Sequence, residues 1–197
     1  MSLPTRSALL LLALAACKDA PPAPAGPASQ AAPGPAAAPA APATPAADTA
    51  PLAVGDPAPE MTMTLHDGKV VTLASYAASG KRVLVYFYPK DDTPGCTVEA
   101  QGLRDRHADL EAAGLVVLGV STQDAASHAA FIDKHDLPFP LVVDTDGAVA
   151  KAFRVPLRAS GLAARQSFLV GRDGKLEQVW LEVDPATHAA DVLAALQ

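Results

Sequence analysis

Residues 83–100 read VLVYFYPKDDTPGCTVEA and contain the junction that decides the fold. The first six, 83–88, form an unbroken run of β-branched, aliphatic and aromatic side chains, which predicts a strand buried on both faces. Pro89 ends that strand. The loop that follows, 89–95, contains two prolines and a glycine, which favour a rigid turn.

A helix is expected from Thr97 to Ala113, with Val98, Leu103 and Leu110 as its apolar positions and a glycine stop directly after it. Cys96 then lies at the first turn of a helix, where backbone N–H groups and the helix dipole favour a thiolate. The loop before it supplies the hydroxyl of Thr93 and, at Gly95, a close backbone approach. Such a loop can hold a small oxidant against a thiolate.

The rest of the C-terminal part alternates strands and helices. Two short strands, 61–65 and 70–73, flank an Asp-Gly turn and predict a hairpin. Further strands are expected at 115–120, 141–143, 167–170 and 176–183, and helices at 121–136, 148–153 and 185–196. This order indicates an α/β sheet with helices on both faces.

The N-terminal quarter has a different composition. Of the 19 prolines in the 197-residue chain, ten lie between Cys17 and Leu52, with fifteen alanines and no leucine, isoleucine, valine or aromatic residue. Because this stretch can bury almost nothing against the entropy of ordering its backbone, we expect residues 17–51 to be a disordered linker. Residues 52–197 are long enough for one domain. The net charge of −6 and the lack of a basic cluster argue against a nucleic-acid partner.

Residues 1–16 resemble a bacterial lipoprotein signal peptide. Arg6 precedes a nine-residue apolar run that is too short to span a bilayer, and the run ends in Leu-Ala-Ala-Cys at 14–17. Cys17 would then be acylated and anchor the protein in the cell envelope facing the periplasm. By resemblance to enterobacterial lipoproteins, Lys18 directly after the anchor favours delivery to the outer membrane. The alternative is an ordinary secretory signal that leaves Cys17 unmodified or removes it.

Residues 88–100, YPKDDTPGCTVEA, resemble the active-site segment of peroxiredoxins of the bacterioferritin-comigratory protein (BCP)/PrxQ subfamily. The Pro-x-x-x-Thr-x-x-Cys signature of that family falls on Pro89, Thr93 and Cys96. The resemblance extends over 52–197 and places the active-site arginine of the family at Arg165. It implies a thioredoxin-like α/β fold with a mixed central sheet, helices on both faces and an N-terminal β-hairpin.

The same resemblance implies a thiol-dependent peroxidase that reduces hydrogen peroxide and organic hydroperoxides in antioxidant defence, with no cofactor and no metal. Cys96 would attack the peroxide and become a sulfenic acid. Arg165 would favour the thiolate and hold the peroxide, and Thr93 would hydrogen-bond the peroxide. Pro89 would shield the sulfur, and Glu99 would orient the arginine.

Two positions depart from the family pattern. Many members carry a resolving cysteine five residues after the peroxidatic one, where this chain has Gln101. We therefore expect the sulfenic acid to be reduced by an external small thiol or thioredoxin-like protein, or to pair with Cys96 of another copy, in a monomer or weak homodimer. Arg154 stands where the family often has glycine.

Two other functions can be compared with the sequence. A thiol-disulfide oxidoreductase of the same fold would need Cys-x-x-Cys, and Glu99 occupies the position of the second cysteine, which argues against this function. A peroxide-sensing lipoprotein that binds a partner through the same site stays open. The five histidines show no ligand spacing beyond the seven-residue spacing of His128 and His135. They are interpreted as surface or packing residues: His66, His107, His128, His135 and His188.

Overall fold

The computed structural model describes residues 50–197. The expected signal peptide 1–16, the anchor Cys17 and residues 18–49 of the expected linker lie outside the described residues. Within the described part of the chain, no helix is long and apolar enough to cross a membrane.

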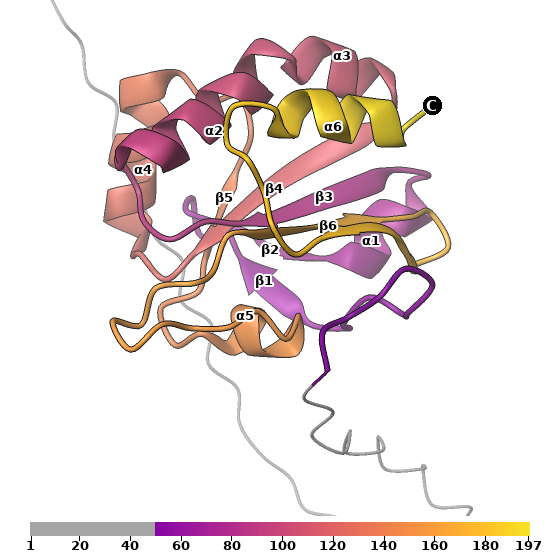
Figure 1. The fold of residues 1–197 in the computed structure, drawn as a ribbon, viewed down its shortest axis with the longest axis horizontal. Helices are drawn as coiled ribbons and strands as arrows, with labels where there is room; N and C mark the ends of the chain where they lie inside the picture. Colours follow the sequence, from indigo (N-terminus) through magenta and orange to yellow (C-terminus); the bar gives the residue numbers. More distant parts are fainter. Residues whose placement is uncertain (1–49) are drawn as a thin grey trace, which may run out of the picture. The chain divides into compact units, whose positions relative to one another are not determined.

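A five-stranded mixed sheet forms the centre of the described residues (Figure 1). Its strand order is β5-β4-β3-β6-β7, in which β3 pairs in parallel with β4 and β4 with β5, while β6 and β7 are antiparallel to their neighbours. The strands span Arg82–Phe87 (β3), Leu115–Ser121 (β4), Leu141–Val143 (β5), Gln166–Val170 (β6) and Leu176–Trp180 (β7). The apolar run 83–88 thus supplies the central strand, as its lack of polar positions predicts.

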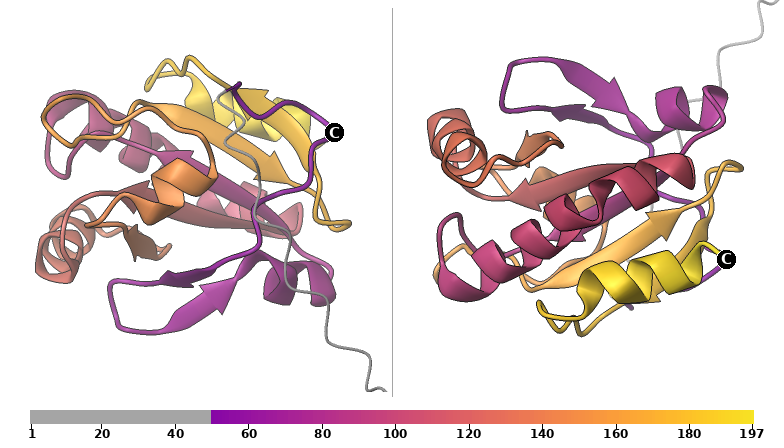
Figure 2. Two further views of the ribbon diagram at one scale, coloured as in Figure 1. Left: turned by 90° about the horizontal axis from the view of Figure 1, so that it is seen from below. Right: turned by 90° about the horizontal axis from the view of Figure 1, so that it is seen from above.

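Both faces of the sheet are covered by helices, as expected from the alternation of elements. Side chains of β3 alternate between two apolar cores, with Val83, Val85 and Phe87 in one and Leu84 and Tyr86 in the other. The first core includes residues of α1 (Leu73–Ala78) and α5 (Ala148–Ala152). The second includes residues of α2 (Pro94–Asp105), α3 (His107–Ala112), α4 (Ala125–His135) and α6 (His188–Ala195). Figure 2 shows α2 and α6 side by side over the sheet, where the two helices pack together.

A separate two-stranded antiparallel sheet joins β1 (Thr62–Thr64) and β2 (Val70–Thr72). Leu73, expected at the end of the second strand, instead begins α1, which the sequence analysis did not predict. The reason is a local cap, because the side chain of Thr72 accepts a hydrogen bond from the backbone N–H of Ser75 at 3.1 Å.

The expected helix 97–113 is wrong in its start and its continuity. It begins at Pro94, which fits a first helical turn because it needs no backbone donor there. It is interrupted at Arg106, whose backbone (φ −105°, ψ 7°) leaves helical geometry between α2 and α3. Leu103 and Leu110 are buried as expected, but Val98 is 47% exposed.

Two other helices are shorter than expected at their N-termini. Ser121 ends β4, and α4 starts only at Ala125 because Asp124 caps it through a hydrogen bond from Ser127 N–H at 2.8 Å. Pro185 lies in the loop before α6, which begins at His188.

Arg154 follows α5 with a φ of 57°, in the left-handed region that favours glycine. This backbone conformation explains why glycine suits the position. Here the arginine side chain hydrogen-bonds the carbonyl of Ala50 at 3.0 Å, an interaction that glycine could not make.

Candidate active site

Cys96 is the third residue of α2 and a buried group of the predicted site. Its residue surface is 2% exposed, and its side chain packs in the core beneath α2 and α6. Thr93 is the N-cap residue and Pro94 the first residue of the helix. The thiol therefore lies within the first turn of a twelve-residue helix, where the unpaired N–H groups favour negative charge.

Arg165 lies next to this sulfur, although it is far from Cys96 in the sequence. It immediately precedes β6, the strand paired with β3, so the sheet brings it to the carboxyl end of β3, where α2 begins. Its Nη2 lies 3.2 Å from Sγ of Cys96, and its Nη1 bonds the carboxylate of Glu99. Burial acts to lower the pKa of Arg165, but the charge of Glu99 and the contact with Cys96 outweigh it and raise that pKa. The guanidinium is a permanent cation beside the sulfur.

Glu99 is the group that holds Arg165 in this position. Its side chain is fully buried, although the helical pattern assigned the inward position to Val98. Leu103 lies four residues further on, so Glu99 and Leu103 share the buried side of α2. A carboxylate is tolerated there because it is paired, and His188 of α6 lies on its other oxygen, with Nδ1 2.9 Å from Oε1.

Pro89 and Thr93 lie in the loop between β3 and α2, and both are half-buried. The hydroxyl of Thr93 donates a hydrogen bond to the carbonyl of Lys90 at 3.1 Å and is not bonded to the sulfur. The roles of Thr93 towards peroxide and of Pro89 as a shield stay predictions.

A buried polar network fixes the loop from behind. The carboxylate of Asp91 accepts hydrogen bonds from the hydroxyls of Tyr88 at 2.7 Å and Ser127 at 2.6 Å, and His128 Nδ1 lies 3.0 Å from it. The other ring nitrogen of His128 lies 3.1 Å from the carbonyl of Val142. Each ring nitrogen thus faces an acceptor. Through His128, the loop is tied to α4 and to the carbonyl of Val142 in β5.

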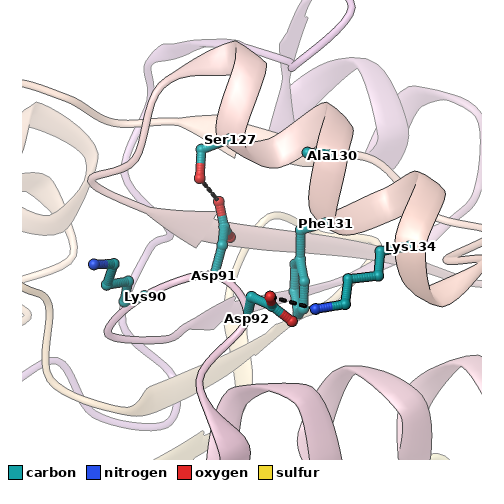
Figure 3. A pocket seen from close by; sticks show the side chains of 7 residues that line it. All are labelled: Lys90, Asp91, Asp92, Ser127, Ala130, Phe131 and Lys134. Atoms are coloured by element: carbon teal, nitrogen blue, oxygen red, sulfur yellow. Dashed lines mark hydrogen bonds and ion pairs between the residues drawn. The ribbon is translucent and has the colours of Figure 1, made fainter.

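The next residue, Asp92, holds the loop from outside. Its φ is 56°, and its carboxylate pairs with Lys134 at 2.5 Å and with His135 at 3.0 Å, both on α4. A cleft of about 310 Å³ lies between the loop and α4. Figure 3 shows Asp91 and Asp92 reaching from the loop to Ser127 and Lys134 across this cleft, which contains neither Cys96 nor Arg165.

Gln101, at the position where many family members carry a resolving cysteine, points to the same part of α4. Its amide nitrogen lies 3.3 Å from Nδ1 of His135. Cys96 is the free cysteine of the described residues.

The sequence analysis missed two residues at this site, His128 and His188. Both are buried, and each is paired with a carboxylate of the loop or of α2. Neither has a sequence neighbour that indicates its partner, because the carboxylates lie 37 and 89 positions away in the chain. Only the fold brings them together.

A thiol at a helix start, beside an arginine held by a carboxylate, is typical of a cysteine-based redox enzyme. Residues 54–179 match the model of the AhpC/TSA family. The chain is 42% identical to peroxiredoxin Bcp of Escherichia coli K12 over 149 residues, 73% of this chain and 94% of that protein. It is 36% identical to peroxiredoxin Bcp of Bacillus subtilis over 152 residues, 74% and 96% of the two chains. The crystal structure of peroxidoxin BcpB from Mycobacterium tuberculosis superposes with a TM-score of 0.68 at 30% identity, covering 73% and 95% of the two chains.

These findings show that the chain belongs to the AhpC/TSA family and is a peroxiredoxin of the Bcp/PrxQ type, a thiol peroxidase. They also confirm the expected thioredoxin-like fold.

Proposed function

We propose that Cys96 reduces hydroperoxides by direct attack on the terminal peroxide oxygen. The thiolate forms the S–O bond as the O–O bond breaks, and the alcohol or water leaves after taking up a proton. The sulfur is oxidised by two electrons to a sulfenic acid, and the peroxide is reduced by the same two. The observation that carries this proposal is the 3.2 Å contact between Arg165 Nη2 and Cys96 Sγ at a helix N-terminus.

Arg165 has two roles in this reaction. Its positive charge favours the thiolate, and its remaining N–H groups can donate to the peroxide oxygens, where charge develops as the O–O bond breaks. Glu99 keeps the guanidinium directed at the sulfur. Thr93 and the backbone N–H of Cys96 are proposed to hydrogen-bond the peroxide, while Pro89 limits access of water.

The sulfenic acid is proposed to be reduced by an external thiol or a thioredoxin-like protein. The full sequence has only two cysteines, Cys17 and Cys96, and the first is the proposed lipid attachment site. With Gln101 in place of a second thiol on α2, an intramolecular disulfide within the helix cannot form. The same reasoning fits a monomer or weak homodimer, in which a disulfide between two Cys96 residues would be the remaining route.

Peroxide consumption by the full chain with dithiothreitol tests this proposal. Cys96→Ser should abolish turnover, whereas the matched control Cys17→Ser should retain it. Mass spectrometry after peroxide treatment should then show one added oxygen on Cys96 in the Cys17→Ser protein. Turnover that survives in Cys96→Ser, or is lost in Cys17→Ser, would contradict a mechanism that uses one thiol.

We also propose that the protein acts in the cell envelope as a lipoprotein. Support comes from Arg6, the apolar run and Leu-Ala-Ala-Cys at 14–17, followed by the Pro/Ala-rich residues 18–51 as a tether. Mass spectrometry of the protein extracted from membranes of the producing bacterium should find acyl chains on an N-terminal Cys17. A soluble product with an unmodified Cys17 would contradict the anchor, and fractionation would decide between the outer membrane, which Lys18 favours, and the inner membrane.

A further inference from the structure

The charges around Arg165 are not balanced when Cys96 is a thiolate. Glu99 and the Cys96 sulfur would then be two anions in contact with one guanidinium, at a place where Glu99 is fully buried and the Arg165 side chain is 17% exposed. A net negative charge in such a site is costly, because little water is present to solvate it. A second cation near Glu99 would remove that cost.

His188 is placed to be this cation. It is 1% exposed, and its Nδ1 lies 2.9 Å from Oε1 of Glu99, the oxygen opposite the one that bonds Arg165. Among the described residues, neither ring nitrogen has a partner in hydrogen-bond geometry. A neutral ring would gain little from a misaligned contact, whereas an imidazolium is attracted to the carboxylate at this distance whatever its alignment.

The two rings that pack on His188 carry no charge. Tyr86 of β3 and Trp180 of β7 contact its ring, with centroids 6.3 and 5.9 Å away. Burial, followed by the charges of Glu99 and Cys96, raises the pKa of Tyr86 well above its ordinary value, so that its hydroxyl stays neutral. On α6 itself, Asp191 is occupied by the hydroxyl of Thr187 at 2.9 Å. Glu99 is the anion that faces His188, with Arg165 and Cys96 directly beyond it.

We propose that His188 is a positioning residue of the peroxidase site, which carries a positive charge when Cys96 is a thiolate and balances the Glu99 anion. His188 and Arg165 would then neutralise Glu99 and the sulfur together. The ring also restrains the Glu99 carboxylate, which in turn directs Arg165. This inference rests on the proposed role of Cys96 as the reacting thiolate, and it adds α6 to the elements that determine its reactivity.

The test compares the rate at which iodoacetamide alkylates Cys96 across a range of pH. The full chain carries Cys17→Ser, so that Cys96 is its sole thiol. His188→Asn retains a donor near the position of Nδ1 but cannot become charged. We expect it to move the midpoint of the alkylation profile to higher pH by about one unit, and to slow alkylation about tenfold at pH values below both midpoints.

His107→Asn on α3 is the matched control, because its ring contacts Phe139 and lies outside the Glu99 cluster. It should leave the profile unchanged. An unchanged midpoint in a folded His188→Asn protein, or an equal shift in His107→Asn, would overturn the proposal.

A second measurement does not depend on the folding of the His188 variant. NMR titration of the His188 ring in the reduced Cys17→Ser protein should show a charged ring over the pH range in which Cys96 is a thiolate. Adding Cys96→Ser should lower the midpoint of the ring titration, and an unchanged midpoint would overturn the coupling. Both experiments are independent of peroxide turnover, so a failure of the proposed function and a failure of this inference are distinguishable.

Discussion

Asp91→Asn should destabilise the protein, because Asp91 is the buried side chain that fixes the loop between β3 and α2. The Asp91 carboxylate accepts hydrogen bonds from Tyr88 and Ser127 and pairs with His128. The side chains of Asp91 and His128 are only 5% and 0% exposed. An asparagine offers one acceptor oxygen, and its amino group faces donors. At least one charge-assisted hydrogen bond, about 1.5–3 kcal/mol, is lost, and His128 loses its carboxylate partner in a buried place. We expect the free energy of unfolding to fall by about 3 kcal/mol, near the lower end for broken buried ion pairs.

The effect should depend on pH in a defined direction. Burial acts to raise the pKa of Asp91, but the hydrogen bonds of His128 and Ser127 and the charge of His128 outweigh it, so that the pKa is lowered. A lowered pKa in the folded state means that the carboxylate stabilises the protein above the unfolded-state pKa of about 4, and that this contribution is lost as the pH falls further. The difference between wild type and Asp91→Asn should therefore be full at pH 7 and shrink below about pH 4.

Urea unfolding at pH 7, 4 and 3 measures both effects. Asp92→Asn is the matched control, because it makes the same chemical change one residue away on a side chain that is 47% exposed, and asparagine tolerates the left-handed backbone there. It should cost no more than about 1 kcal/mol, as expected for exposed ion pairs. Equal stability of Asp91→Asn and wild type at pH 7, or a difference that persists unchanged at pH 3, would refute the buried ion pair.

Three further substitutions test the site and the core. Arg165→Lys should lower the rate constant for peroxide reduction about 10²–10³-fold in stopped-flow assays, because an ammonium group lacks the fixed fork by which a guanidinium contacts both Cys96 and a second acceptor. A loss smaller than tenfold would contradict that geometry. Gly119→Ala should cost about 1–3 kcal/mol in urea unfolding, since a Cβ there would lie 2.7 Å from the Tyr86 hydroxyl, and an unchanged midpoint would show that the ring can move aside. Phe153→Ala should cost about 3–5 kcal/mol by the same measurement, because its fully buried ring packs on two other phenylalanines, and a cost below 1 kcal/mol would mean that the cavity collapses.

The central strand could be predicted because its sequence carries no polar position, and the position of Cys96 at the start of a helix because strand, loop and Cys96 are contiguous. The boundaries of the helices were less predictable. Pro94 was assigned to the loop although proline fits a first helical turn, and the start of α1 depended on one side-chain cap at Thr72. At such positions the loop conformation and the helical conformation differ by a single hydrogen bond.

The inward position of Glu99 could not be predicted from hydrophobic periodicity. The pattern favours Val98, because a carboxylate is costly to bury, and only the partners Arg165 and His188 reverse that preference. Both partners come from distant parts of the sequence. Hydrophobic periodicity does not show polar core positions of this kind, whereas the resemblance of residues 88–100 to the peroxiredoxin segment indicates that Glu99 contacts the arginine.

The arrangement of α2 has a consequence for how such a protein can evolve. Cys96, Glu99 and Leu103 face the core, whereas Gln101 turns towards His135 on α4. Mutation at position 101 can therefore change how the oxidised sulfur is returned to its thiol without touching the groups that meet the peroxide. In the proposed mechanism, the helix would therefore separate the groups that meet the peroxide from the position that bears on the return of the sulfur to a thiol, and substitution could alter the second while leaving the first intact.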